Sequence, residues 1–351
     1  MKHCICVAVA LLVQIRDAGA APILSVPHVL VSSASLGDGV SRVNAATGQY
    51  IDKLFTGLNL SSGAPMAVGP DGNLYIGSFS QDVVYKFNIR TGTNFGVFAA
   101  SANGVRGITF GPNGNLFVAA ANANAVKEYD GITGEFIRNF ISISAPIDLT
   151  FGPDNILYVA RGHHQITSSS SIVRYDGLSG AFLGTFASQQ VDTPQALLVR
   201  SDGDVFVTNQ WFGAAPLVKF DGATGAVEFT ATGLNNPQGL LLLPDRTLLV
   251  ATHSRLINRY NADTGAFLGA FISDSRLGTT SDLIYVVPEP SSAMLGVTAI
   301  LVLIVLLGAR KVEQLIDPGI ARFSASATRR SISGNTSDMV DISARHRASV
   351  C

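Results

Sequence analysis

Cysteine is missing from the whole interior of this 351-residue sequence, whose three cysteines are Cys4, Cys6 and Cys351. A disulfide framework, a cysteine metal site and a cysteine nucleophile are therefore excluded for everything in between. A domain in that region has to be held together by its own core.

Charged residues are also scarce. They make up 14% of the sequence, and the formal net charge is −1; an average soluble domain has about 25%. Because nucleic-acid binding requires clustered Lys and Arg, a nucleic-acid partner is excluded. The near-neutrality is a cancellation: residues 21–287 hold 15 Lys and Arg against 19 Asp and Glu, whereas residues 310–351 hold 7 against 4.

Common catalytic signatures are missing too. The sequence has no Gly-rich phosphate loop, no G-x-S-x-G nucleophile elbow and no H-E-x-x-H zinc motif. These absences leave the sequence nearly silent on catalysis, so its organisation has to be examined first.

Glycine, by contrast, is abundant, with 35 residues, and much of it belongs to an internal repeat. A Thr-Gly or Ser-Gly pair recurs at spacings of 44, 42, 46, 45 and 40 residues, at Thr47-Gly48, Thr91-Gly92, Thr133-Gly134, Ser179-Gly180, Thr224-Gly225 and Thr264-Gly265. Alternating apolar and polar residues flank each pair, which predicts half-buried strands on both sides. A period of 20–50 residues is typical of repeat folds.

Each repeat also contains two apolar strands joined by a tight turn. The frame is clearest at residues 66–76 (MAVGPDGNLYI), 108–118 (ITFGPNGNLFV) and 149–159 (LTFGPDNILYV), and it weakens at 197–207 and 240–250. Pro, Asp and Gly suit the successive positions of such a turn. Four strands per repeat predict the blade of a β-propeller.

The two ends of the repeat region complement each other. Residues 28–33 match the second strand of a blade with no first strand before them, and residues 282–286 match a first strand with nothing after it. Joined, they complete a sixth blade and remove the exposed sheet edges of a linear array. We therefore predict an all-β, six-bladed propeller over residues 21–287, closed by both termini.

The frame P-x-G-[LI]-x-F-G-P-D-G-N-L-Y-V, followed by V-x-x-Y-D-G-x-T-G, resembles the NHL-type six-bladed propellers of exported bacterial proteins. The resemblance covers about residues 28–287. It implies the fold and says little about activity.

Residues 1–20 have the pattern of a secretory signal peptide. Lys2 is followed by an apolar run over residues 4–13 and by the small residues Ala18-Gly19-Ala20. Arg16 and Asp17 depart from the pattern, and the alternative is a buried N-terminal helix.

The C-terminal part has a second targeting pattern. Seventeen uncharged residues, 293–309, follow Pro288-Glu289-Pro290 and precede Arg310-Lys311, which predicts a short transmembrane helix with its basic end in the cytoplasm. Residues 288–311 resemble a PEP-CTERM sorting signal. The resemblance implies processing by an exosortase-type enzyme and an anchor in the inner membrane, with the propeller outside the cytoplasm or released to the cell surface or extracellular matrix.

Residues 312–351 are rich in Ser and Arg and poor in aromatics, so we expect a disordered basic tail. A cytoplasmic tail, a segment removed in processing and a divergent extension of the reading frame all fit this composition.

In a propeller, the loops that lead into the innermost strands and those between second and third strands meet around the channel. The channel-facing position at the start of the inner strands is expected to be held by Met66, Arg106, Ile147, Gln195, Gln238 and Ser281. Asp148 and Asp282 follow one residue later and could approach the channel. The Glu that a lactonase-type propeller uses for its metal has no counterpart here, because Glu128, Glu135 and Glu228 fall on outer strands or turns.

The loops between second and third strands vary most, and variable loops on a rigid scaffold are where binding usually occurs. Trp211 suits stacking on a sugar ring, or packs on its own blade; His163, His164 and His253 could hold a metal or form an acid/base pair, or are simply solvated. The candidate binding face is Arg106, Arg161, His163, His164, Gln195, Asn209, Trp211, Gln238, His253 and Arg255.

Repeated Asp residues have a simpler interpretation. Asp71, Asp154, Asp202 and Asp245 fall in hairpins, and Asp130, Asp176 and Asp221 fall in Asp-Gly turns, where Asp bonds the backbone ahead of it. We favour this turn role over metal binding.

Two hypotheses follow. The favoured one is an exported, non-enzymatic binding or scaffold protein at the surface or in exopolysaccharide, with a glycan or an envelope protein as partner and no cofactor. The alternative is a lactonase-like propeller hydrolase or lyase that uses a divalent cation, with His163, His164 or His253, on a small exported substrate.

Overall fold

The computed structural model describes residues 26–288, apart from 34–38, 59, 61–63, 164–165 and 211–215. The expected signal peptide, the residues 289–311 of the expected sorting signal and the basic tail lie outside these residues. Within them, no helix is long and apolar enough to cross a membrane.

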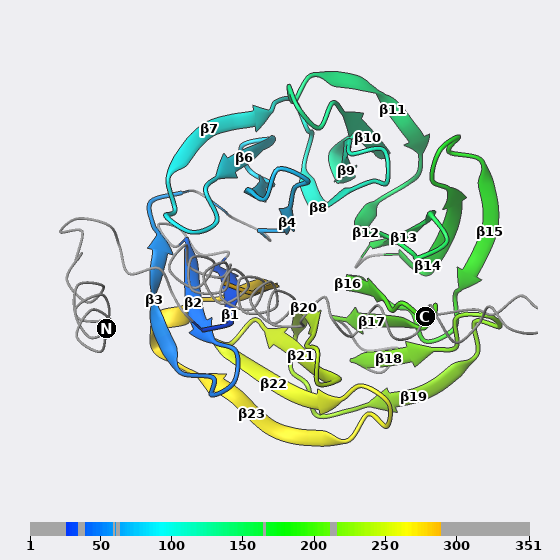
Figure 1. The fold of residues 1–351 in the computed structure, drawn as a ribbon. Coiled ribbons are helices and arrows are strands. Elements are labelled where there is room, and N and C mark those ends of the chain that lie inside the picture. The colour runs from blue at the N-terminus through cyan, green and yellow to red at the C-terminus, as the bar shows by residue number, and fades with distance from the viewer. Residues whose placement is uncertain are drawn as a thin grey trace, which may run out of the picture. The chain divides into compact units, whose positions relative to one another are not determined.

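The described residues form six four-stranded antiparallel sheets arranged as the blades of a ring (Figure 1), which confirms the predicted six-bladed propeller. Blade 1 consists of β24 (Thr280–Val286), β1 (His28–Ser33), β2 (Val40–Asn44) and β3 (Tyr50–Phe55). Blade 2 consists of β4 (Met66–Val68), β5 (Leu74–Ser78), β6 (Val83–Phe87) and β7 (Asn94–Ala99). Blade 3 consists of β8 (Val105–Phe110), β9 (Leu116–Ala120), β10 (Ala125–Tyr129) and β11 (Phe136–Ser142).

Blade 4 consists of β12 (Pro146–Phe151), β13 (Ile156–His163), β14 (Ile166–Asp176) and β15 (Phe182–Ala187). Blade 5 consists of β16 (Pro194–Val199), β17 (Val205–Asn209), β18 (Leu217–Phe220) and β19 (Val227–Ala231). Blade 6 consists of β20 (Pro237–Leu242), β21 (Thr247–Thr252), β22 (Leu256–Asn261) and β23 (Phe267–Ser273). Two short 3-10 turns, Ala121–Ala123 and Ser275–Leu277, complete the described elements.

Blade 1 is built from both ends of the propeller. The inner strand β24 pairs antiparallel with β1, so that Val29 lies opposite Tyr285 and Leu30 opposite Ile284. The predicted closure is therefore confirmed, and the inner and second strands of this blade come from opposite ends of the region.

The core lies between neighbouring blades. One apolar cluster joins Phe117 and Val126 of blade 3 to Leu157 and Val173 of blade 4. Aromatic rings lock the same junction, because Phe117 meets Phe151 of the next inner strand edge to face, with ring centroids 5.2 Å apart. Such pairs add to the stabilisation that area burial supplies.

The repeated Thr/Ser-Gly pair also serves the blade junctions. The glycines of all six pairs have φ between +70° and +76° (Gly48, Gly92, Gly134, Gly180, Gly225, Gly265), and each packs against the outer strand of the preceding blade. A Cβ on Gly134, for example, would overlap the carbonyl oxygen of Phe98 in β7. The pair is thus a turn and a packing contact at once, which explains why glycine recurs there.

Five of the six inner strands, all but β4, carry an irregularity near their start. In β12 Pro146 pairs with Arg161 and Asp148 with Ala160, so that Ile147 has no partner; β8 and β16 leave out Arg106 and Gln195 in the same way. The pairings of β20 and β24 also shift at this level. A bulge changes the direction of the side chains around it, and this determines what the channel presents.

Candidate functional site

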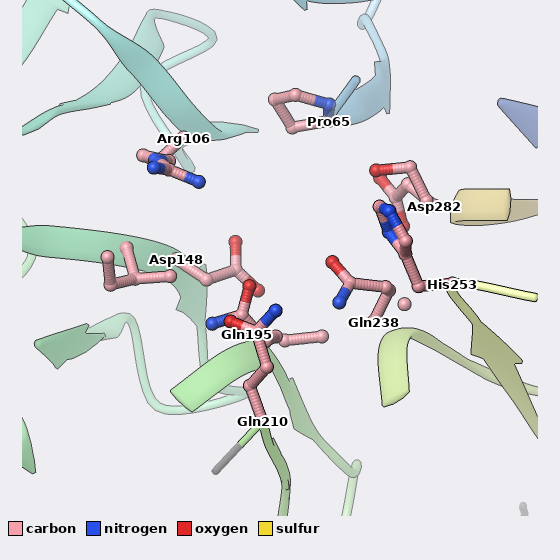
Figure 2. A pocket seen from close by; sticks show the side chains of 12 residues that line it. Pro65, Arg106, Asp148, Gln195, Gln210, Gln238, His253 and Asp282 are labelled. Atoms are coloured by element: carbon pink, nitrogen blue, oxygen red, sulfur yellow. The ribbon is translucent and has the colours of Figure 1, made fainter. Parts of the chain in front are cut away.

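A cavity of about 280 Å³ opens at one end of the channel (Figure 2). Two sets of segments line it, namely the starts of inner strands and the residues that follow second strands. Its lining is Pro65, Arg106, Ile147, Asp148, Gln195, Ala196, Gln210, Gln238, Gly239, His253, Ser281 and Asp282. The expected meeting of these two sets around the channel is observed.

Five of the six residues expected at the channel-facing position line this cavity: Arg106, Ile147, Gln195, Gln238 and Ser281. The sixth, Met66, was assigned wrongly. It corresponds to Ile108 in the hairpin frame, two residues beyond Arg106, and its side chain is buried with only 6% exposed. Pro65 lines the cavity in blade 2 instead.

Consecutive residues of the inner strands face the cavity in pairs, such as Gln195 and Ala196 or Ser281 and Asp282. In a regular strand, neighbouring side chains point to opposite faces. The bulge removes this alternation, and it therefore brings Asp148 and Asp282 to the channel together with the residues before them. The sequence placed both aspartates near the channel but contained no visible sign of the bulge.

Asp148 and Asp282 lie at the boundary between this cavity and a second one of about 350 Å³, which continues along the inner strands of all six blades. Both carboxyl groups contact the cavities and are otherwise enclosed by the ring. The two aspartates therefore lie where the two cavities meet.

Each of these carboxyl groups joins two blades. In Asp148, Oδ1 accepts the N–H of Leu149 at 2.9 Å and Oδ2 accepts the N–H of Leu197 in β16 at 2.8 Å. In Asp282, Oδ1 accepts the N–H of Leu283 at 2.8 Å and Oδ2 accepts the N–H of Met66 in β4 at 2.7 Å. The two residues are equivalent in their blades and make equivalent contacts.

A glycine in the preceding blade makes room for each aspartate. A Cβ on Gly107 would lie 2.6 Å from Oδ1 of Asp148, and a Cβ on Gly239 would lie 2.8 Å from Cα of Asp282. In blades 1 to 6, the inner-strand position that holds these aspartates is occupied in turn by Asp282, Pro65, Gly107, Asp148, Ala196 and Gly239. Around the ring, an aspartate thus recurs after three blades, and a glycine precedes each aspartate.

The environment disfavours the charged form of both carboxyl groups. Burial, and to a smaller extent the negative charge of Asp282, raise the pKa of Asp148 to about 8. The hydrogen bonds from the N–H groups of Leu197 and Leu149 lower this pKa, but by less. Burial raises the pKa of Asp282 to about 6. The cavity therefore contains two acids whose ionisation is costly without a positive partner.

The wall of the 280 Å³ cavity also carries neutral polar side chains. Gln195 and Gln238 are half-buried, and their amide nitrogens are held by the protein: Nε2 of Gln195 donates to the carbonyl oxygens of Thr193 and Pro194, and Nε2 of Gln238 donates to Oδ1 of Asn236. The amide oxygens of both residues are left as acceptors. His253 is exposed at the mouth, after β21, and Gln210 follows β17.

Arg106 supplies the cationic group of the lining. Its guanidinium lies over the ring of Phe79, 4.5 Å from the centroid, and burial lowers its pKa. Arg106 belongs to β8 of blade 3 and Phe79 follows β5 of blade 2, so the guanidinium lies where these two blades meet.

The other candidate residues are placed as follows. Asn209 is buried, and its side chain accepts the N–H of Asp192 and donates to the carbonyl oxygen of Gln190, so it holds the loop before β16. Arg161 lies in β13 opposite Pro146, and Arg255 is exposed. His163 is the last residue of β13. His164 and Trp211 lie outside the described residues.

One cluster has the composition of a metal site, but a lysine occupies it. Oxygens of Asp204, Asp221 and Glu228 lie within 4.8 Å of one another, the single such group of His, Cys, Asp and Glu in the described residues. Nζ of Lys219 contacts Asp204 at 2.6 Å and also pairs with Glu228. The ammonium group takes the place a cation would have, and the cluster is a structural ion pair of blade 5.

The repeated turn aspartates bond the backbone ahead of them, as predicted. Oδ1 of Asp130 accepts the N–H of Ile132 and Thr133, and Oδ1 of Asp154 accepts the N–H of Ile156. Their periodicity follows from the turns.

No protein-family profile matches the sequence, and no curated protein sequence matches it. The likenesses to NHL-type repeats and to a PEP-CTERM signal therefore remain predictions.

Solved structures resemble the fold over about three quarters of the chain. A chain of a nidogen/laminin complex is similar with a TM-score of 0.63 and 11% identity, over 75% of this chain and 100% of that one. A protein of unknown function from Bacteroides caccae has a TM-score of 0.55 and 16% identity, over 75% and 99%. A gluconolactonase from Xanthomonas campestris, XC5397, has a TM-score of 0.52 and 16% identity, over 76% and 91%. At these identities the likeness is one of fold alone.

Proposed function

We propose that this protein is a binding module that holds a small, polar, sugar-like ligand at the mouth of its channel. The observation that carries the proposal is the 280 Å³ cavity, lined by glutamines, a guanidinium, an imidazole and two carboxyl groups. Ligand pockets are usually apolar with a few polar groups, whereas this lining suits a molecule that bonds through hydroxyl groups on several sides.

The scaffold fits such a role because the lining residues come from different blades that are locked to one another. Asp148 ties β12 to β16, Asp282 ties β24 to β4, and Oγ1 of Thr208 in blade 5 donates to the carbonyl oxygen of Gln238 in blade 6 at 2.7 Å. A rigid wall reduces the entropy that binding costs.

We further propose that the protein acts outside the cytoplasm. Support comes from the sequence: the signal-like residues 1–20, the apolar residues 293–309 and the PEP-CTERM-like elements Pro288, Glu289, Pro290, Arg310 and Lys311. In this proposal an exosortase-type enzyme handles the C-terminal segment, the inner membrane receives the helix, and the ligand belongs to a glycan or an envelope protein.

Calorimetric titration of the purified full-length protein with a panel of monosaccharides tests the binding. We expect Gln195→Ala and Gln238→Ala each to weaken binding several-fold, because each removes an acceptor from the cavity wall. Gln49→Ala is the matched control, since Gln49 is exposed in the turn between β2 and β3. Absence of binding by every sugar, or equal binding by all three variants, would refute the proposal.

The second candidate is a lactonase-like hydrolase or lyase. It is favoured by the presence of Asp148, Asp282 and His253 in one cavity. Carboxylate and amide oxygens suit a calcium or magnesium ion, and Gln195 and Gln238 add amide oxygens. Titration with calcium, magnesium and zinc tests this candidate, which loses its mechanism if none of the three ions binds.

A further inference from the structure

The two channel aspartates face each other across the ring. Blades 1 and 4, which carry Asp282 and Asp148, are separated by two blades in either direction. Both residues line the same cavity, and Figure 2 shows their carboxyl groups directed into it from different sides.

Acceptor oxygens dominate the surroundings of that space. Nε2 of Gln195 donates to the carbonyl oxygens of Thr193 and Pro194. Nε2 of Gln238 donates one hydrogen bond, to Oδ1 of Asn236, and the amide oxygens of both glutamines remain as acceptors for a ligand. A ligand that brings hydrogen-bond donors and a positive charge complements these oxygens and the two carboxyl groups.

The acidic groups and the imidazole of the cavity do not by themselves form a three-ligand cation site. No three of the carboxylate oxygens and imidazole nitrogens of Asp148, Asp282 and His253 come within 4.8 Å of one another, because the group within the described residues that meets this criterion lies in blade 5. A larger cation with its own donors can reach opposite walls, as an ammonium group carried on a sugar ring does.

We propose that the channel cavity selects a sugar that carries a free, protonated amine, with the ammonium group bound between Asp148 and Asp282 and the hydroxyl groups bound by Gln195 and Gln238. This inference rests on the proposed function and makes it specific: the ligand class is the amino sugar, as opposed to the neutral or N-acetylated sugar. The titratable and charged groups facing the ligand are Asp148, Asp282, Arg106 and His253. The guanidinium of Arg106 lies over the ring of Phe79, and Figure 2 shows this side chain on the side of the cavity that carries Asp148.

Ionisation links ligand and protein. Without a ligand, burial raises the pKa of Asp148 to about 8, so this group carries a proton below that pH. An ammonium group beside it favours the carboxylate and lowers that pKa. Binding of the amino sugar at pH 6.5 therefore releases a proton, whereas binding of a neutral sugar does not.

The experiment compares glucosamine, N-acetylglucosamine and glucose by calorimetry on the full-length protein at pH 6.5, in two buffers of different ionisation enthalpy. We expect glucosamine to bind at least 10-fold more tightly than the two neutral sugars, with a buffer-dependent heat that reports proton release. In Asp148→Asn and Asp282→Asn the preference should fall to less than about 3-fold, while Asp154→Asn, which changes an exposed turn residue, should keep it.

The outcomes separate the two proposals. Equal affinity for all three sugars would overturn the amine preference and leave the binding function intact, whereas no binding by any sugar would overturn both. The proton release is measured on the unaltered protein, so the proposal is tested even if the aspartate variants fold poorly. Tight glucosamine binding without proton release would overturn the placement of the amine between the carboxyl groups.

Discussion

We expect Asp148 to affect stability, because its side chain bonds N–H groups in two blades while its charge has no positive partner among the groups that set its pKa. A carboxyl group whose pKa is raised by folding binds its proton more tightly in the folded state. Its contribution is fully present below the pKa of the unfolded chain, about 3.9, and is lost as the pH rises through the folded value of about 8. The free energy of unfolding should therefore decrease with pH across this window.

We expect the urea midpoint to fall between pH 6.5 and 8, by an amount equivalent to about 1–2 kcal/mol. This range avoids His28, whose pKa is lowered by burial and which affects stability only below its ordinary value of 6.5. In Asp148→Asn the midpoint should be nearly constant over the same range, although lower overall by about 1 kcal/mol because one amide loses its acceptor. A midpoint that rises from pH 6.5 to 8 in the unaltered protein would contradict the assignment.

Single residues show where the sequence was sufficient and where it was not. The period of the repeat placed Arg106, Gln195 and Gln238 at the cavity because they occupy one position in equivalent strands. Met66 was misplaced because blade 2 lacks a recognisable residue at that position, and Asn209 turned out to hold a loop. Gln210, which lines the cavity, was not among the candidates, since nothing in the sequence distinguishes it from its neighbour.

At the scale of elements, the strands followed from alternation and turn chemistry, whereas the bulges that aim the cavity residues did not. A bulge depends on the pairing of two strands, and one strand's sequence does not contain that information. The same is true of the outer strands, where the pairing of β6 with β7 shifts register twice. Such irregular edges resist pairing with another sheet, which is useful where Phe95 and Val97 are more than half exposed.

The Thr/Ser-Gly turns allow a test of the blade junction. Gly134→Ala should lower the free energy of unfolding by about 2–4 kcal/mol, because the added methyl group strains a residue at φ +76° and overlaps the carbonyl oxygen of Phe98. Gly114→Ala is the matched control: φ there is +80° but nothing lies within 4 Å of the new Cβ, so its cost should be about 1 kcal/mol. Equal midpoints in urea for the two variants would show that the turns carry no packing role.

At the scale of the whole molecule, the pairing of β1 with β24 joins the N-terminal and C-terminal ends of the propeller sequence and closes the ring. Leu30 and Ile284 are opposite each other in this pairing and belong to the same apolar cluster. In a chain with Cys4, Cys6 and Cys351 changed to Ser, Leu30→Cys with Ile284→Cys should form a disulfide that closes almost the entire propeller. The oxidised form should be more stable than the reduced form by about 2–5 kcal/mol, since long loops lose most entropy in the unfolded state.

Urea unfolding of the same variant with and without reductant measures this difference, and each sample is the control for the other. A disulfide that forms without raising the midpoint would mean that the ring opens elsewhere before blade 1 separates.

The closure of blade 1 also constrains the order in which the ring can fold. Strand β1 is among the first parts of the propeller to be synthesised, and its partner β24 is the last. Contacts between residues so far apart in the sequence form slowly, because the chain loses entropy when a long loop closes before the new contact contributes any favourable free energy. Until residues 280–286 arrive, the second strand of blade 1 has an open edge and the inner wall of the channel lacks Asp282. The chain therefore spends its synthesis without a closed ring, and the cavity at the channel is complete only after the final pairing.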